Sequence, residues 1–92
     1  MRIFVVLEKG EEGQEPYGCY SLDAPGCITT GKSVENALEN MKEALALYWD
    51  GEQLPSSFRS DKDVLQEHPL KSGEFLTSVE INMHNKTSTV AA

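Results

Sequence analysis

The sequence predicts an α+β fold, in which an antiparallel sheet carries one main helix on one face in the order β-β-β-α-β. Three observations support this prediction. Short segments rich in β-branched and aromatic residues stand near both ends of the chain. Two further strand-like segments flank a Pro-Gly turn, and one amphipathic stretch of helical periodicity follows them.

Residues 2–8 are predicted to form the first strand. Its apolar residues alternate between the two faces, with Ile3, Val5 and Leu7 on one and Phe4 and Val6 on the other. A strand that is apolar on both faces needs cover on both. The helix provides one cover, and either a second subunit or the chain's own connector over residues 52–73 provides the other.

The second and third strands are predicted at residues 17–22 and 27–30, after an acidic, glycine-rich loop at residues 9–16. Between them, Ala24-Pro25-Gly26-Cys27 fits a type II turn, because proline presets φ at the second position and glycine accepts a positive φ at the third. The first three strands then form an antiparallel meander.

The main helix is predicted over residues 34–50. Ser33 is placed to cap its first turn, and Gly51 is placed to end it in a left-handed conformation. Apolar residues recur at steps of three and four along it, namely Val34, Ala37, Leu38, Met41, Ala44, Leu45 and Tyr48. This spacing gives one apolar stripe that packs on the sheet.

The connector over residues 52–73 is long for a compact domain, so a short helix inside it is expected. Ser60 is a suitable cap for a helix at 61–67, with Val64 and Leu65 as its apolar anchors.

Alternating residues predict a last strand at 74–83 that joins the sheet. We therefore expect one domain over residues 1–83, followed by a flexible tail at 84–92.

Charge and length limit the possible functions. The 92 residues suit one small domain with a thin core, which association with other subunits would help. Fifteen acidic against 8 basic residues give a net charge of −7. An acidic surface repels phosphate, so no direct binding to nucleic acid is expected. It attracts a basic protein partner, although solubility alone also explains the charge.

No stretch of the sequence is long and apolar enough to span a membrane, and its apolar start is too short for a signal peptide. We expect a cytoplasmic protein.

The sequence predicts no catalytic residue, no cofactor and no metal site. Cys19 and Cys27 are expected as free thiols, and they lack the nearby histidine of a zinc site. His68 and His84 are expected on the surface, because neither has a sequence-near partner for a nucleophile–base pair.

An enzymatic alternative is a residual metal-dependent nuclease. Glu8 and Asp23 lie near predicted strand ends, where carboxylates could converge on Mg²⁺.

Four residues are candidates for an interface with a partner or a second copy. Phe4, Val6 and Tyr20 are candidates because the first strand needs a second cover. Trp49 is a candidate because large aromatic residues are frequent at interfaces. The alternatives are packing of the first three against the connector at 52–73, and burial of Trp49 in the core.

Several motifs between residues 17 and 48 recur together in one known family. They are Leu22-Asp23-Ala24-Pro25-Gly26-Cys27, then Gly31, then Ser33-Val34-Glu35-Asn36-Ala37-Leu38-Glu39-Asn40-Met41-Lys42-Glu43-Ala44, and finally Leu47-Tyr48. On these motifs, and on the places of its first and last strands, the chain resembles the N-terminal domain of HicB-type antitoxins over about residues 1–83.

This resemblance implies a partial RNase H-type fold and assembly into dimers or larger homo-oligomers. It implies a partner, HicA, a small basic toxin that cleaves RNA and whose catalytic surface the antitoxin covers. Many members also carry a C-terminal DNA-binding domain, and no such segment follows the last predicted strand here. The alternative within the resemblance is an orphan structural domain without a toxin.

Overall fold

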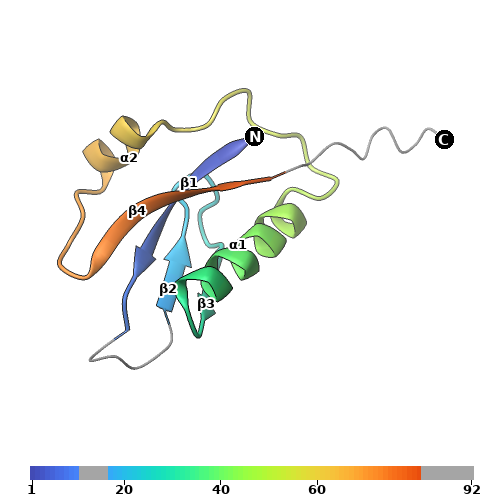
Figure 1. Ribbon diagram of the computed structural model, residues 1–92. Coiled ribbons are helices and arrows are strands. Elements are labelled where there is room, and N and C mark those ends of the chain that lie inside the picture. The colour runs from blue at the N-terminus through green and yellow to red at the C-terminus, as the bar shows by residue number, and fades with distance from the viewer. Residues whose placement is uncertain (11–16, 82–92) are drawn as a thin grey trace.

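The computed structural model describes residues 1–10 and 17–81 and shows a four-stranded sheet with two helices (Figure 1). In chain order the elements are β1 (Arg2–Glu8), β2 (Tyr17–Tyr20), β3 (Ile28–Gly31), α1 (Val34–Tyr48), α2 (Asp61–Glu67) and β4 (Glu74–Glu80). The predicted α+β fold and the order of its elements are confirmed. The predicted tail, the end of the last predicted strand and residues 11–16 lie outside the described residues.

The sheet is antiparallel throughout, in the order β3-β2-β1-β4. β1 is thus a central strand. β2 ends at Tyr20, two residues before the predicted end, because the chain turns at Ser21. The Ser21 hydroxyl donates to the carbonyl of Phe4 at 3.2 Å and accepts from the amide of Asp23 at 3.1 Å.

The turn between β2 and β3 has the predicted geometry. Gly26 has a φ of +88°, and the amide of Cys27 donates to the carbonyl of Ala24 at 3.0 Å. A positive φ at the third position of such a turn is the mark of type II and explains the glycine.

α1 begins and ends with the predicted signals. The Ser33 hydroxyl accepts from the amide of Asn36 at 3.0 Å, which pairs one of the unsatisfied donors of the first turn. The helix ends at Tyr48, with Trp49 as its C-cap. Gly51 follows with a φ of +77°, the left-handed conformation expected beyond a helix end.

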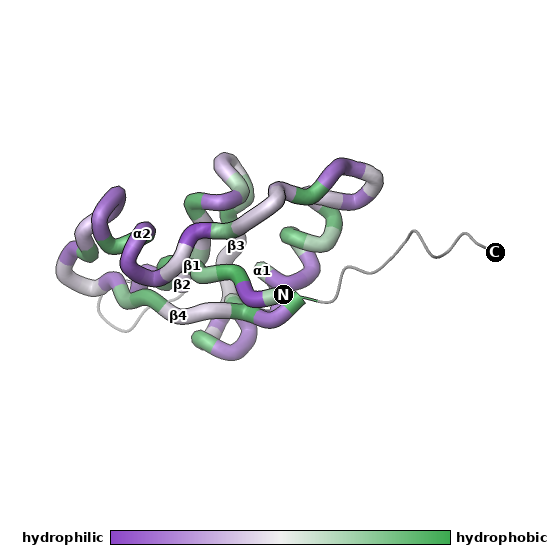
Figure 2. The backbone as a smooth tube through the Cα atoms, turned by 90° about the horizontal axis from the view of Figure 1, so that it is seen from above, coloured by the Kyte–Doolittle hydropathy of each residue, from purple (hydrophilic) through white to green (hydrophobic). Residues whose placement is uncertain are grey.

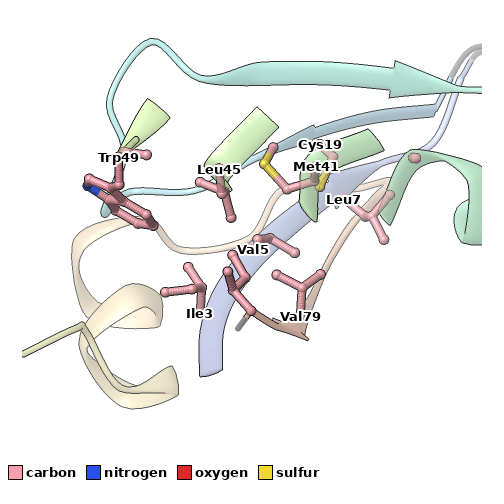
Figure 3. Close-up of a cluster of buried hydrophobic side chains, with 11 residues drawn as sticks. Ile3, Val5, Leu7, Cys19, Met41, Leu45, Trp49 and Val79 are labelled. Atoms are coloured by element: carbon pink, nitrogen blue, oxygen red, sulfur yellow. The ribbon is translucent and has the colours of Figure 1, made fainter. Parts of the chain in front are cut away.

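The core lies between α1 and one face of the sheet (Figure 3). Its buried side chains come from three strands and the helix, with Ile3, Val5, Leu7, Cys19, Met41, Leu45, Trp49 and Val79 labelled in the close-up. The predicted stripe of α1 therefore provides the helical half of the core.

The connector from α1 to β4 passes from one face of the sheet to the other (Figure 1). Phe58 first packs on Trp49, with ring centroids 5.4 Å apart. The Arg59 side chain then donates to the carboxylate of Asp23 at 3.0 Å and to the carbonyl of Leu22 at 3.1 Å. These contacts tie the connector to the loop after β2 and lead it to α2, on the side of the sheet away from α1.

α2 has the predicted start, where Ser60 and Asp63 form a reciprocal capping box. Val64 is buried, with 1% of its surface exposed. The prediction of Leu65 as a second anchor is wrong, since 41% of it is exposed. A helix of two turns presents a narrow stripe to the sheet, and adjacent residues point about 100° apart. Figure 2 shows the result, a largely hydrophilic α2 beside a hydrophobic β1.

Among the described residues, neither helix has the length and apolar character needed to cross a membrane.

Candidate functional site

The four interface candidates differ in how much surface they expose. Trp49 is 5% exposed and belongs to the core of the chain itself. Val6 is fully buried. Phe4 and Tyr20 are half-buried, so these two retain surface for a partner. The interface role of all four stays a prediction.

The second cover of β1 is largely the chain's own connector. Val6 lies opposite Tyr20 in the β1–β2 register, so both point away from α1. The side chain of His68, directly after α2, bonds to the hydroxyl of Tyr20. The connector therefore covers the middle of this face, which is one of the two arrangements that the sequence left open.

A hydrogen-bonded cluster of Tyr20, His68 and Glu74 fixes the end of the connector to the sheet. The Tyr20 hydroxyl lies 2.7 Å from His68 Nε2 and donates to Glu74 Oε2 at 3.2 Å, and Glu74 Oε1 lies 3.0 Å from His68 Nε2. The Glu74 side chain is only 7% exposed. The expectation of His68 as a plain surface residue is wrong, because its ring is partly buried in this cluster.

The cluster perturbs two of its members. The backbone amide of Lys71, followed by hydrogen bonding and charge from His68, lowers the pKa of Glu74 below its ordinary value. Burial, followed by the charge and hydrogen bond of Glu74, raises the pKa of Tyr20 to about 12. Tyr20 is therefore neutral and Glu74 is ionised at neutral pH. These protonation states stabilise the hydrogen-bonded cluster and do not prepare a nucleophile.

Asp23 and Glu8 do not come together as a nuclease site. Glu8 is the last residue of β1 and lies opposite Gly18. From Gly18 the chain runs through Tyr20 to Asp23, away from Glu8 and toward the opposite end of the sheet. Asp23 also has its own cation, since its Oδ1 accepts from the side chain of Arg59. Among the described residues, no group of three or more histidine, cysteine or acidic side chains is arranged to hold a metal ion.

The two cysteines are free thiols, as predicted. Burial, followed by the neighbouring Cys27, raises the pKa of Cys19 to about 12, and burial also raises the pKa of Cys27. Both thiols are protonated at neutral pH and are poor nucleophiles.

A groove of about 250 Å³ runs between α1 and β4 on the core side of the sheet. Its lining is apolar at the base and charged at the rim, and consists of Glu35, Leu38, Glu39, Lys42, Ser78, Val79 and Glu80. Three carboxylates lie there beside the Lys42 ammonium group, and one of them, Glu80, is paired with the N-terminal ammonium group. The hydrogen bond and charge of the N-terminal ammonium, 3.0 Å away, lower the pKa of Glu80. The sequence indicates Glu35 and Glu39 on the exposed side of the helix, but not that β4 lies beside them.

A family model described as "HicB_like antitoxin of bacterial toxin-antitoxin system" matches residues 3–91. This chain belongs to that family. The predicted resemblance to a family of antitoxins is thereby confirmed.

Two relatives of this HicB-like chain are described as UPF0150 proteins. One, from Helicobacter pylori, is 46% identical over 48 residues, which are 52% of this chain and 62% of the relative. The other, from Archaeoglobus fulgidus, is 42% identical over 48 residues, which are 52% of this chain and 67% of the relative. The matches thus span roughly two thirds or less of these relatives' length.

Two solved structures share the fold of the HicB-like chain. The N-terminal domain of the Burkholderia pseudomallei antitoxin HicB superposes with a TM-score of 0.73 at 20% identity, covering 90% of this chain and all of that one. A chain from a HicA3 and HicB3 toxin–antitoxin complex gives a TM-score of 0.62 at 27% identity, with 90% and 100% coverage. The first confirms the fold, and the second is a chain of a toxin–antitoxin complex.

Proposed function

We propose that this HicB-like chain is the antitoxin of a toxin–antitoxin pair and that it binds a small, basic HicA-type ribonuclease and covers its catalytic surface. The observation that carries the proposal is the family match over residues 3–91. The similarity to a chain from a HicA3 and HicB3 complex supports the identity of the partner.

The charge of the chain supports a basic partner. The net charge of −7 creates a negative potential that speeds the encounter with a cationic protein. The structure adds that two of these carboxylates, Glu35 and Glu39, line the groove between α1 and β4. We expect the association rate to fall as salt is added, because screening weakens this attraction.

A ribonuclease-inhibition assay tests the proposal. The HicA-type protein of the same genome is purified, and its cleavage of a fluorescent RNA is measured while the antitoxin is added. Inhibition that is complete near equimolar amounts supports the proposal, and an unrelated acidic protein of similar charge serves as control. Undiminished cleavage at a large excess of the chain contradicts it.

The same assay tests the enzymatic alternative. The chain alone is incubated with the RNA and Mg²⁺ or Mn²⁺. Metal-dependent cleavage that is lost in Asp23→Asn would replace the antitoxin proposal by the nuclease alternative.

We also infer self-association, as the thin core of a small domain favours it. Phe4 and Tyr20 are the candidates that keep exposed surface for it. Sedimentation of the chain over a range of concentrations measures the assembly, and Phe4→Ser is expected to shift it toward monomer. A chain that stays monomeric at every concentration rules this inference out.

A further inference from the structure

The outer edge of β4 carries backbone groups that the described residues leave unpaired. The hydrogen bonds that flank the β1–β4 ladder fix its phase, since Met1 and Ile81 exchange two bonds of 2.8 Å and the amide of Lys9 donates to the carbonyl of Gly73 at 2.9 Å. In an antiparallel pair, residues alternate between bonding to the partner and pointing away from it. Residues 75, 77 and 79 therefore bond to β1, and residues 76, 78 and 80 point outward.

This edge lacks the usual protection of natural sheets. Proteins blunt exposed edges with proline, with charged side chains, with bulges or with a covering segment. The middle of β4 reads Phe75-Leu76-Thr77-Ser78-Val79, without charge, proline or glycine. Its seven residues pair with β1 without a bulge, and it is the last strand in the sheet order β3-β2-β1-β4.

The opposite edge of the sheet is different. β3 has four residues, and its outward carbonyl at Thr30 accepts a bond of 2.8 Å from the side chain of Asn40. The sheet therefore offers one long edge and one short, partly capped edge. An extended peptide gains its affinity from main-chain hydrogen bonds to such an edge, so the long one is the better template.

The groove between α1 and β4 adjoins this edge and would select the side chains of an added strand. Alternate side chains of that strand would point to the α1 side, over the apolar base formed by Leu38 and Val79. Glu35 and Glu39 line the same groove, so cationic side chains fit there best. Phe75, on the same face of β4, is 39% exposed and extends the apolar strip.

We propose that the outer edge of β4 docks an extended segment of a cationic partner protein, which adds one strand to the sheet and places lysine or arginine side chains over the Glu35–Glu39 rim. This docking mode rests on the proposed antitoxin function, and it specifies the surface that the basic toxin uses.

Charge disfavours a second copy of the chain as the occupant. Two copies of the chain each bring a net charge of −7 to the interface, so they repel one another. A cationic strand is attracted by the same charge.

A proline scan of the two edges tests the proposal. Ser78→Pro removes an outward N–H and places a ring at the edge, while the bonds from residues 77 and 79 to β1 remain. Thr30→Pro does the same on β3 and is the matched control. Binding of the purified HicA-type protein of the same genome is measured by calorimetry, with circular dichroism of each variant to confirm folding. We expect binding about tenfold or more weaker for Ser78→Pro and nearly unchanged for Thr30→Pro.

Amide exchange provides a second measurement that needs no variant. In the free chain, the amides of residues 76, 78 and 80 are expected to exchange rapidly by NMR, and the HicA-type protein should slow them selectively. The outward amides of residues 28 and 30 on β3 serve as internal controls.

The outcomes separate this inference from the function on which it rests. The docking site is overturned, but the antitoxin role is not, if the complex forms while the outward amides of β4 still exchange freely. The same conclusion follows if the Ser78→Pro variant binds the HicA-type protein as tightly as the parent chain does. Protection of these amides that grows with the chain's own concentration assigns the edge to a second copy and overturns the cationic occupant. Failure of the parent chain to bind at all overturns both proposals.

Discussion

A close approach between α1 and the sheet at Gly31 predicts a severe effect of Gly31→Ala. A β-carbon built at Gly31 lies 2.4 Å from the backbone nitrogen and 2.6 Å from the α-carbon of Ala37, and 2.8 Å from the carbonyl carbon of Asn36. These neighbours are main-chain atoms of the first turn of α1, so no side chain can swing aside. Ordinary contact begins at 3.4 Å, and the helix must therefore retreat by about 1 Å.

The cost follows from that movement. Forcing an additional methyl group into a packed site typically costs about 1–3 kcal/mol, and we expect the upper end because rigid backbone must move. Replacing glycine also stiffens the unfolded chain, which by itself raises the free energy of unfolding by about 0.4–1 kcal/mol. The matched control Gly18→Ala shares this stabilisation. It adds no clash, because its β-carbon meets nothing closer than 3.8 Å. The two variants should thus differ by about 3 kcal/mol, or roughly 15 °C in Tm.

Urea and thermal unfolding of both variants measure the difference. Far-UV circular dichroism follows the secondary structure, and the fluorescence of Trp49, the one tryptophan of the chain, follows the core at the end of α1. Gly18→Ala should equal or exceed the parent chain in stability. Equal midpoints for the two variants would refute the close approach of α1 to β3.

Three further predictions concern the connector. Arg59→Ala should lower the free energy of unfolding by about 2 kcal/mol in urea, because the Asp23 carboxylate, 6% exposed, loses its cation; a loss below about 0.5 kcal/mol would contradict a tight pair. The lowered pKa of Glu74 gives stability that is complete above its ordinary value of 4.5 and is lost as pH falls through the folded value. Glu74→Gln should therefore show a smaller fall in Tm from about pH 6 to about pH 3 than the parent chain, and an equal fall would exclude this contribution. Ser60→Ala removes one half of the capping box and should cost about 1 kcal/mol, while an unchanged urea midpoint would show that α2 needs no cap.

The elements predicted correctly are those whose signals are local in the chain. The type II turn follows from Pro25 and Gly26, and the start of α1 follows from Ser33, because each acts on atoms within a few residues. The stripe of α1 was also predictable, since helical spacing records which side is buried. The apolar residues on both faces of β1 predicted correctly that both faces are covered, since Val5 and Val6, on opposite faces, are fully buried.

The sequence could not show what covers the second face of β1. A second subunit and the chain's own connector leave the same apolar pattern on Val6, so the pattern cannot separate them. The structure places the connector there. The hydrogen-bonded cluster that fixes the connector joins His68 to Tyr20, 48 residues away in the chain. Such a contact leaves no periodicity and no motif in the sequence, which is why the sequence predicts a surface residue at His68.

The sequence does not predict the proposed docking edge for a different reason. An exposed edge depends on strand order, and the alternating pattern of β4 fits equally well beside β1 or beside β3. Once β4 lies beside β1, the long uncharged edge and the Glu35–Glu39 rim of α1 become neighbours. Main-chain bonds at such an edge tolerate many side chains, whereas the rim decides which charge the partner must carry. A change of the rim residues alone would therefore alter the charge that a partner must carry, while the same edge stays available.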